Sequence, residues 1–339
     1  MPDDPLVVTV TDGTLQSVTL TDSNGDVYKG DLSGNTWTGE RTFWPNKSYT
    51  VTAQVLDHSK APTTLTKTFT TKATDTNVYE PNYTASPLGI GMPVYIQFHS
   101  PVTDQALRAA IEKHGTVTTT PQQAGSWGWV DNKILMWRPQ NYWQPGSKVD
   151  VKLEFGGLKA DDGVYLADDT SYSLTYGESH VMRVDLTTQH MTLAQSGNQI
   201  RDFKVSTGEA GHETYTGTKV IMEKFASMVM DSGTFGVPAT APGGYKLQVA
   251  DCQRLTWSGE FLHAAPWSVS DQGVRPVSHG CTNLSPDDAK WLIDFTLIGD
   301  PVEFSGNFPG TSSIAFTPDD GVGCWTYDWN AWQKQSALA

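Results

Sequence analysis

Apolar and β-branched residues alternate with threonine and serine through the first part of the chain. Threonine supplies 19 of the first 84 residues, and runs such as 49–53 (Tyr-Thr-Val-Thr-Ala) place every second side chain on the same side of an extended backbone. Three dipeptides typical of tight turns interrupt these runs: Asp12-Gly13, Asn24-Gly25 and Ser33-Gly34. The pattern predicts a β-sandwich over residues 1–74. Reactive side chains do not cluster in it, so we expect it to carry no chemistry.

A second β-rich stretch follows at residues 75–177. Alternating runs predict four strands, at Val94 to Phe98, Ile134 to Trp137, Val149 to Phe155 and Ser171 to Tyr176. The polar segment 74–81 predicts a linker ahead of them, and Asp104 to Lys113 is a short helical candidate. The tryptophan and proline spacing of the first stretch is echoed weakly in the second. The echo favours two immunoglobulin-like sandwiches in tandem.

Residues 178–305 form a third block of mostly strands and glycine turns, with one clear helix. Ser285 is a favourable N-cap for that helix, Pro286 suits its first position, and two acids follow in the first turn. We expect the helix to stop at Gly299. The remaining segment, 306–339, is too short to bury its own large aromatic residues and should pack on an earlier domain. These aromatic residues are Trp325, Tyr327, Trp329 and Trp332.

Charge and hydropathy exclude several classes of partner. The 339 residues hold 23 Lys and Arg against 37 Asp and Glu, a net charge of -14, and an acidic surface without a basic patch repels nucleic acid. No run approaches the ~18 consecutive apolar residues that a membrane-spanning helix needs. The first five residues lack the features of a signal peptide. We therefore expect either a cytoplasmic protein or the mature part of an exported one.

One constellation of reactive side chains lies near the end of the third block. His263 ends an apparent strand, and His279, Gly280 and Cys281 follow within the string Ser-His-Gly-Cys-Thr-Asn at 278–283. A cysteine with an ordinary pKa of about 8.5 needs a base or a positive neighbour to act as a nucleophile. His263, 18 residues before Cys281, can lie on an adjacent strand and face the thiol. Gly280 leaves room for a substrate carbonyl, so these residue types indicate an acyl-transfer site.

Two other interpretations of these residues remain open. In the first, Cys281 is an inert buried thiol and the histidines are ordinary polar residues. Spacing alone gives this interpretation and the catalytic one similar weight. In the second, His263, His279 and Cys281 bind zinc as a mixed three-ligand set. No nearby residue stands out as a general base for metal-assisted chemistry, so zinc ranks lower. We expect no metal and no other cofactor.

The string at 278–283, with a histidine sixteen residues before His279, resembles the signature of the L,D-transpeptidases with the YkuD catalytic domain. Further segments resemble mycobacterial and related actinobacterial members: Met230-Asp-Ser, Phe235-Gly-Val-Pro, Gly244-Tyr245, Trp257-Ser258-Gly259 and Ala265-Pro-Trp267-Ser-Val. Those members combine one or two immunoglobulin-like domains, the catalytic domain and a short Trp-rich extension. The resemblance therefore covers the whole chain. It implies a mainly β protein with two sandwiches, a catalytic domain at 178–305 and an extension at 306–339.

The resemblance implies peptidoglycan cross-linking outside the cytoplasmic membrane, with the full-length protein anchored through a segment that this chain lacks. Cys281 would attack the third residue of a tetrapeptide stem and expel the terminal D-Ala. The side-chain amine of a second stem would then take the acyl group, giving a 3→3 cross-link. His263 would be the base, and His279 and Gly280 would shape the site. Carbapenem β-lactams would acylate the same cysteine.

Substrate-binding roles also follow from the resemblance. Tyr245, with the amides of Gly280 and Cys281, would face the oxyanion, and Asn283 would hold the loop. The segment 238–245, rich in Gly and Pro, would be a mobile lid. The other substrate-binding residues would be Met230, Phe235, Ser258, Trp267 and Ser278.

Two positions depart from the family pattern. Ala264 stands where a serine is frequent, which is harmless if that position acts through its backbone carbonyl. Phe235 stands where close relatives have a lid tyrosine, so any contact made by that hydroxyl is lost. In an exported protein, Cys252 and Cys324 could form a disulfide that pins the extension to the catalytic domain.

Two alternatives to cross-linking stay open. An L,D-carboxypeptidase would form the same acyl-enzyme and pass it to water, and the sequence is nearly silent on the acceptor side of the pocket. A non-catalytic wall-binding protein would use its sandwiches and carry a decayed catalytic block. The intact Cys, His and Gly set argues against decay.

Overall fold

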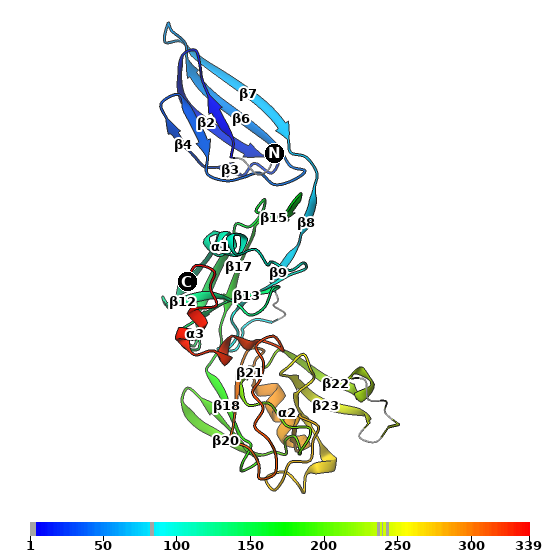
Figure 1. The fold of residues 1–339 in the computed structure, drawn as a ribbon. Coiled ribbons are helices and arrows are strands. Elements are labelled where there is room, and N and C mark those ends of the chain that lie inside the picture. Colours follow the sequence, from blue (N-terminus) through cyan, green and yellow to red (C-terminus); the bar gives the residue numbers. More distant parts are fainter. Residues whose placement is uncertain (1–4, 82–84, 236–237, 239, 242–243) are drawn as a thin grey trace.

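Three β-rich units follow one another along an elongated molecule (Figure 1). The computed structural model describes residues 5–81, 85–235, 238, 240–241 and 244–339. The first sandwich lies at one end and the block after residue 178 at the other, while the C-terminus returns to the middle unit. The predicted fold class, mainly β with immunoglobulin-like units ahead of a β-rich block, is confirmed.

The first unit is a sandwich of two sheets, with strand orders β1-β5-β4 and β3-β2-β6-β7. The period-two pattern places threonines on the exposed side of β6 and β7, where the hydroxyls of Thr50 and Thr68 lie 3.1 Å apart. Trp37 and Tyr49 point inward and are buried in the core. The strands are β1 (Val7–Thr9), β2 (Thr14–Asp22), β3 (Val27–Tyr28), β4 (Gly30–Ser33), β5 (Thr36–Gly39), β6 (Ser48–Leu56) and β7 (Pro62–Thr70).

The second unit has two main sheets, with orders β12-β13-β10-β9 and β11-β14-β17, and a small sheet β15-β16-β8. The predicted helix is present as α1 (Gln105–His114), whose N-cap Asp104 accepts a hydrogen bond from the backbone N–H of Leu107 at 2.7 Å. The four predicted strands are also present. The strands are β8 (Asp75–Asn77), β9 (Tyr79–Pro81), β10 (Val94–Phe98), β11 (Gly115–Thr120), β12 (Gly125–Trp129), β13 (Ile134–Pro139), β14 (Lys148–Leu153), β15 (Lys159–Asp161), β16 (Val164–Leu166) and β17 (Thr170–Thr175).

The predicted linker at 74–81 is wrong, because this segment forms β8 and β9. Strand β8 pairs in parallel with β16, and β9 pairs antiparallel with β10. Side chains fix both strands: the Asn77 amide donates to the Ser100 carbonyl at 3.2 Å and accepts from its N–H at 3.0 Å, and Tyr79 is buried. A polar composition did not prevent strand formation, because the sheets satisfy the backbone groups.

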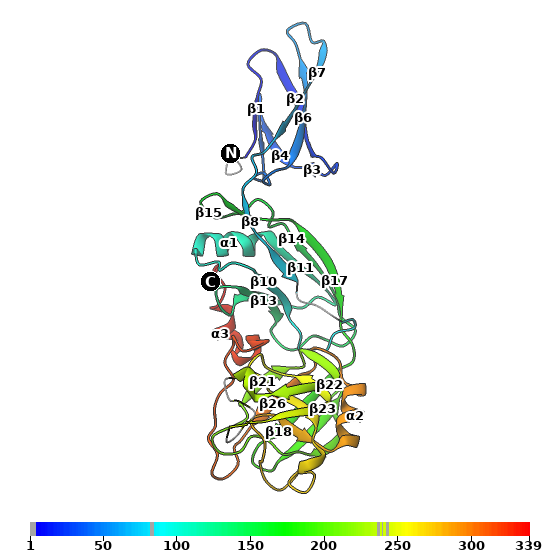
Figure 2. The ribbon, with the colours of Figure 1, turned by 90° about the vertical axis from the view of Figure 1, so that its right-hand side faces the viewer.

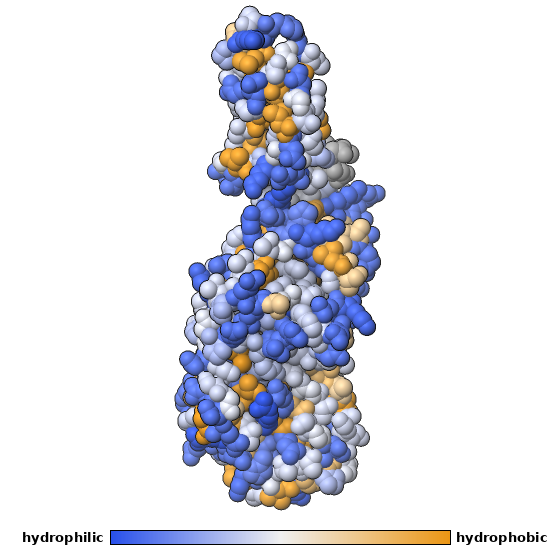
Figure 3. Space-filling view, turned by 90° about the vertical axis from the view of Figure 1, so that its left-hand side faces the viewer, coloured by the Kyte–Doolittle hydropathy of each residue, from blue (hydrophilic) through white to orange (hydrophobic). Residues whose placement is uncertain are grey.

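Arg41 connects the first two units. Its guanidinium binds Asp169 through two hydrogen bonds of 2.6 and 2.9 Å, and it donates to the carbonyls of Glu154 and Gly156 at 3.0 and 3.2 Å. The space-filling view shows a narrow waist between these units (Figure 3). A two-pronged Arg–carboxylate pair fixes orientation as well as distance, so the junction has a defined geometry.

The third unit consists of a five-stranded sheet, β20-β19-β18-β26-β21, and a four-stranded sheet, β22-β23-β24-β25. Helix α2 (Pro286–Phe295) packs on β23 and β24. The strands are β18 (His180–Asp185), β19 (His190–Gln195), β20 (Asn198–Lys204), β21 (Gly217–Val220), β22 (Glu223–Asp231), β23 (Lys246–Arg254), β24 (Phe261–Ala264), β25 (Thr282–Leu284) and β26 (Pro301–Ser305), with short 3-10 helices η1 (Ser232–Phe235) and η2 (Pro266–Ser268).

Helix α2 begins as predicted and ends earlier than predicted. Ser285 is its N-cap and accepts from the backbone N–H of Asp288 at 3.2 Å. The helix stops at Phe295 rather than Gly299, because Thr296 is extended and its hydroxyl oxygen lies 2.7 Å from both the carbonyl oxygen of Leu292 and Oε1 of Gln253. Neither α1 nor α2 exceeds ten residues, and no helix in the described ranges is long and apolar enough to cross a membrane.

The C-terminal segment leaves the third unit and packs on the second (Figure 2). It contains η3 (Gly323–Thr326) and α3 (Trp329–Gln333). The Trp332 side chain is fully buried, donates through its indole N–H to Ser126 at 3.1 Å, and lies so close to Gly128 that a Cβ there would approach the ring to 2.7 Å. The large aromatic residues of this short segment therefore join a core that the second unit provides.

The predicted disulfide between Cys252 and Cys324 is wrong. All three cysteines lie in the described part of the chain and are unpaired. Cys252 belongs to the same buried cluster as Cys281, whereas Cys324 belongs to the core of the second unit. The extension is held by aromatic packing and hydrogen bonds instead.

Candidate active site

Two neighbouring parallel strands bring the predicted base and the predicted nucleophile to one cavity. In β24 and β25, His263 pairs with Asn283, and Cys281 immediately precedes β25. The cavity has a volume of about 180 Å³. It is lined by Met230, Tyr245, Leu247, Val249, His263, Trp267, Val277, Ser278, His279, Cys281 and Asn283.

His263 is held in one orientation. Its side chain is 3% exposed, and its Nδ1 lies 2.9 Å from the carbonyl oxygen of Ala264. Nδ1 therefore carries the hydrogen and donates, which leaves Nε2 as the nitrogen that can take a proton. Because the contact uses the backbone of residue 264, alanine serves there as well as serine. Burial lowers the pKa of His263, so the ring is neutral at neutral pH.

Cys281 is also neutral at rest. Burial raises the pKa of its thiol to about 12, against the opposing effect of a backbone hydrogen bond from Phe261. The sulfur lies 3.5 Å from the carbonyl oxygen of Gly259, to which the S–H donates. A thiol in this environment needs a nearby base at the moment of attack, and the neutral ring of His263 lines the same cavity.

The turn before Cys281 requires glycine. Gly280 has φ +111°, a conformation that side-chain-bearing residues rarely adopt. The Ser278 hydroxyl donates to the carbonyl of Cys281 at 2.5 Å and accepts from the N–H of Gly280 at 3.2 Å. The Thr214 hydroxyl donates to the carbonyl of Gly280 at 2.7 Å. The Gly280 amide thus has a partner in this structure, with which a substrate oxyanion would compete.

Asn283 and Trp267 line the same cavity as the thiol. The Asn283 amide donates to the Ser268 hydroxyl at 3.1 Å, which ties β25 to η2. Trp267, also in η2, is 52% exposed, and its ring centroid lies 6.0 Å from that of His263. Asn283 therefore fixes the segment that presents Trp267 at the cavity rim.

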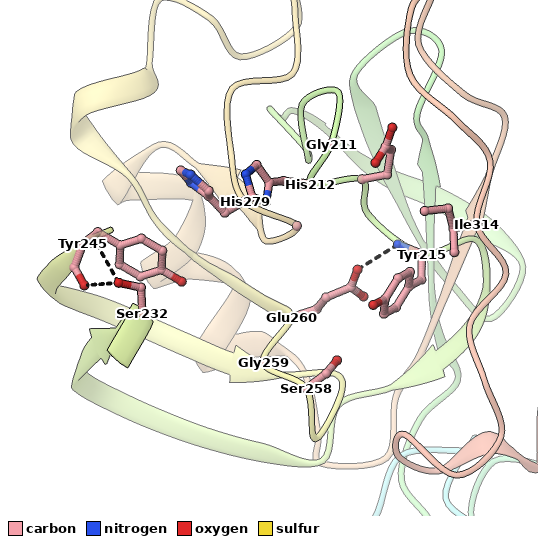
Figure 4. A pocket seen from close by; sticks show the side chains of 12 residues that line it. Gly211, His212, Tyr215, Ser232, Tyr245, Ser258, Gly259, Glu260, His279 and Ile314 are labelled. Carbon is pink, nitrogen blue, oxygen red and sulfur yellow. Dashed lines mark hydrogen bonds between the residues drawn. The ribbon is translucent and has the colours of Figure 1, made fainter. Parts of the chain in front are cut away.

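A second cavity, of about 300 Å³, adjoins the first through Tyr245 and His279, which line both (Figure 4). The His279 ring lies 4.4 Å from that of His212 and 5.4 Å from that of Tyr245, between centroids. Ser258 and Gly280 border this cavity. Both the hydroxyl and the backbone N–H of Ser258 donate hydrogen bonds to the carboxylate of Asp320, the latter at 2.6 Å. The C-terminal segment therefore holds this turn.

The two cavities bring together most of the predicted site residues. The exception is Phe235, whose side chain lies outside the described residues. Positions 239, 242 and 243 of the lid predicted at 238–245 also lie outside them. Within the described ranges, no group of three or more His, Cys, Asp or Glu stands close enough together to hold a metal ion. The zinc alternative therefore has no geometric support.

Sequence reasoning missed the charged and aromatic residues of the second cavity. Glu260 lines it and pairs with the buried Lys219, and Tyr215 and His212 complete that side. Each of these residues stands alone in the sequence. The two groups that bind the Glu260 carboxylate, on Lys219 and Tyr215, lie 41 and 45 positions away from it. No local spacing signals such a pair.

Comparison with known proteins identifies the family of this chain. A family model described as the L,D-transpeptidase catalytic domain matches residues 179–304, and one described as a bacterial Ig domain matches residues 1–159. The chain is 33% identical to L,D-transpeptidase 2 of Mycobacterium tuberculosis, over 99% of this chain and 82% of that protein. The chain belongs to the L,D-transpeptidase family. L,D-transpeptidase 5 of the same species is 32% identical, over 100% of this L,D-transpeptidase and 74% of its own length.

Two solved structures resemble about two thirds of this L,D-transpeptidase. One is the LD transpeptidase LdtMt1 in complex with imipenem, with a TM-score of 0.57 and 32% identity over 67% of this chain and 100% of that chain. The other is L,D-transpeptidase 3 from M. tuberculosis in complex with a faropenem-derived adduct, with a TM-score of 0.55 and 28% identity over 69% and 95% of the two chains. The enzyme class predicted from the sequence is confirmed.

Proposed function

We propose that this L,D-transpeptidase forms 3→3 peptidoglycan cross-links through an acyl-enzyme on Cys281. The thiol gives its proton to Nε2 of His263 as the sulfur attacks the carbonyl carbon of the third residue of a tetrapeptide stem. The bond to the terminal D-Ala breaks, and His263 returns the proton to the departing amine. The side-chain amine of a second stem then attacks the thioester, and the released thiolate recovers a proton.

One observation carries this proposal: a neutral imidazole with its Nδ1 fixed by a carbonyl lines the same cavity as a neutral thiol. Both residues are buried, with exposed fractions of 9% for Cys281 and 3% for His263, and burial favours the neutral form of each side chain. Proton transfer inside such a site keeps the pair neutral overall, so the attack creates charge only where the protein and substrate can hold it.

The two adjoining cavities suit a reaction with two substrates. The first cavity encloses the sulfur, as an acyl donor requires, and the second reaches it past Tyr245 and His279. We assign substrate binding to Tyr245, Met230, Trp267 and Asn283 on this basis. Carbapenems would acylate the same sulfur, as the imipenem complex of the related LdtMt1 suggests. Peptidoglycan places the reaction outside the cytoplasmic membrane.

Intact-mass measurement after incubation with imipenem tests the nucleophile. We expect one adduct per chain, and none with Cys281→Ala. His263→Gln should retain the thiol and form the adduct at least ~100-fold more slowly, within the range that loss of a general base costs. An adduct that persists in Cys281→Ala would overturn the assignment.

A purified disaccharide tetrapeptide separates cross-linking from hydrolysis. The product of transfer is a dimer that has lost one D-Ala, whereas an L,D-carboxypeptidase would give only the tripeptide monomer. Mass analysis distinguishes the two. If only the tripeptide monomer appears at substrate concentrations where the acyl-enzyme forms, the protein is a carboxypeptidase and not a transpeptidase.

We also propose a division into domains at residues 1–74, 75–177, 178–305 and 306–339, with the sandwiches acting as a spacer ahead of the enzyme. The first sandwich contributes no residue to either cavity among those described. Deleting residues 1–73 should therefore leave turnover of soluble stem peptides unchanged. Loss of that turnover in a folded protein would show a further role.

A further inference from the structure

A buried ion pair lies against the catalytic turn, and the mechanism above does not use it. Lys219 of β21 contacts Glu260, which directly precedes β24, and the two side chains are 0% and 7% exposed. The other carboxylate oxygen of Glu260 accepts from the backbone N–H of Tyr215 at 2.7 Å (Figure 4). The Lys219 ammonium also lies 4.0 Å from the ring centroid of Phe304. Both oxygens of the carboxylate are therefore anchored.

Stability alone does not account for this pair. Two charges lose their hydration on burial, and well-packed apolar residues of similar volume often replace a buried ion pair with no loss of stability. The pair does fix the position of the backbone that carries Glu260. Each oxygen of its carboxylate binds one partner, which restricts the orientation of the side chain.

The peptide groups of Gly259 and Phe261, on either side of Glu260 in the sequence, both hydrogen-bond to the sulfur of Cys281. The carbonyl of Gly259, before Glu260, accepts from the thiol at 3.5 Å, and the backbone of Phe261, after Glu260, hydrogen-bonds to the sulfur. A Cβ built at Gly280 would lie 3.8 Å from Cγ of Glu260, so this side chain also packs against the residue before the nucleophile. Displacing Glu260 would displace both contacts to the sulfur.

We propose that Glu260, anchored by Lys219 and by the Tyr215 amide, is a positioning residue that holds its two flanking peptide groups against the Cys281 sulfur. The inference rests on the proposed function, in which that sulfur is the nucleophile. The S–H contact to Gly259 sets the resting direction of the thiol, and the Phe261 amide stabilises the thiolate as it forms. Glu260 acts through these peptide groups and does not itself exchange a proton with substrate.

The decisive variant replaces both charges together, Lys219→Met with Glu260→Met. It fills the same space with apolar side chains, so the protein should fold and unfold at the wild-type temperature or above it. The anchor to Tyr215 is lost, and we expect the limiting first-order rate of acylation by imipenem to fall about 10- to 100-fold, the range that a small misplacement of a reacting group costs. The imipenem concentration for half-maximal rate should change much less.

A rescue variant and a control sharpen the test. Lys219→Met with Glu260→Gln keeps an oxygen that can accept from the Tyr215 N–H, and should recover part of the rate. The control is His180→Ala, which breaks another buried pair of the same unit: His180 Nδ1 lies 3.0 Å from Asp300 Oδ2, with side chains 7% and 0% exposed. It should lower the unfolding temperature and leave the acylation rate per active thiol unchanged.

The outcomes separate the two proposals. If the double methionine variant acylates at the wild-type rate while Cys281→Ala forms no adduct, the positioning role is wrong and the nucleophile stands. If Cys281→Ala still forms the adduct, the proposed function fails first. If the double methionine variant does not fold, the single variant Glu260→Ala is compared with wild type instead, and an unchanged acylation rate would refute the inference.

Discussion

Gly280→Ala perturbs the turn beside the nucleophile without crowding it. The added Cβ would meet Cγ of Glu260 at 3.8 Å and the Glu213 carbonyl at 3.9 Å, which are ordinary contact distances. The cost therefore comes from the backbone, because φ is +111°. Holding an alanine in such a region costs about 1–3 kcal/mol. The turn either bears this strain or rotates to relieve it.

Rotation of the turn would move the nucleophile. The Gly280 amide and carbonyl are held by Ser278 and Thr214, and Cys281 follows at once. We expect an unfolding temperature lower by a few degrees and a limiting rate of imipenem acylation that falls by up to about 100-fold. Differential scanning calorimetry and single-turnover mass measurements give the two quantities.

Gly197→Ala is the matched control. Gly197 has φ +81° and nothing within 4 Å of its added Cβ among the described residues, and it lies in the turn between β19 and β20. Both positions have a positive φ, so both variants should lose stability, but acylation by Gly197→Ala should keep its wild-type rate. If Gly280→Ala loses no more activity than Gly197→Ala, the catalytic turn does not depend on the backbone conformation at Gly280.

Three further predictions concern other parts of the molecule. Burial holds the pKa of His263 below its ordinary value. Its contribution to stability is therefore present above about pH 6.5, the pKa in the unfolded chain, and is lost as the pH falls towards the lower pKa in the folded protein. The unfolding temperature of the wild type should fall more steeply with acid than that of His263→Gln. Arg41→Ala should broaden the distribution of distances between the first two units in small-angle scattering, while Arg41→Lys broadens it less and imipenem acylation stays unchanged in both. Thiol titration of denatured, unreduced protein should give three thiols per chain, and a value of one would contradict the unpaired state of Cys252 and Cys324.

Local patterns predicted the elements that local physics determines. The alternation at 94–98 matched β10 residue for residue, and the cap at Ser285 marked the start of α2, because strand periodicity and capping involve only near neighbours in sequence. The end of α2 was misplaced, since Thr296 stops the helix with the help of Gln253, 43 positions away. The polar segment at 74–81 was misread for a similar reason, because its partner strands lie elsewhere in the chain.

The site divides in the same way. Ser278 to Asn283 and His263 could be found from the sequence, because a reactive cysteine, two histidines and a glycine within 19 residues form a compact signal. Lys219 and Glu260 could not, because either charge alone resembles an ordinary surface residue. Only the fold shows that both are removed from water and face each other.

Burial acts on the base and the nucleophile in the same sense, and this determines when the site becomes reactive. It lowers the pKa of His263 and raises that of Cys281, so each group is pushed towards its neutral form. Both shifts disfavour a thiolate–imidazolium pair in the resting enzyme. Charge must instead appear with substrate bound, when the carbonyl carbon accepts the electrons of the sulfur. Cys252 and Cys324 share the raised thiol pKa of about 12. What distinguishes Cys281 is therefore not acidity but its place in a cavity that also holds an oriented imidazole, and its reactivity should depend on substrate shape more than on pH.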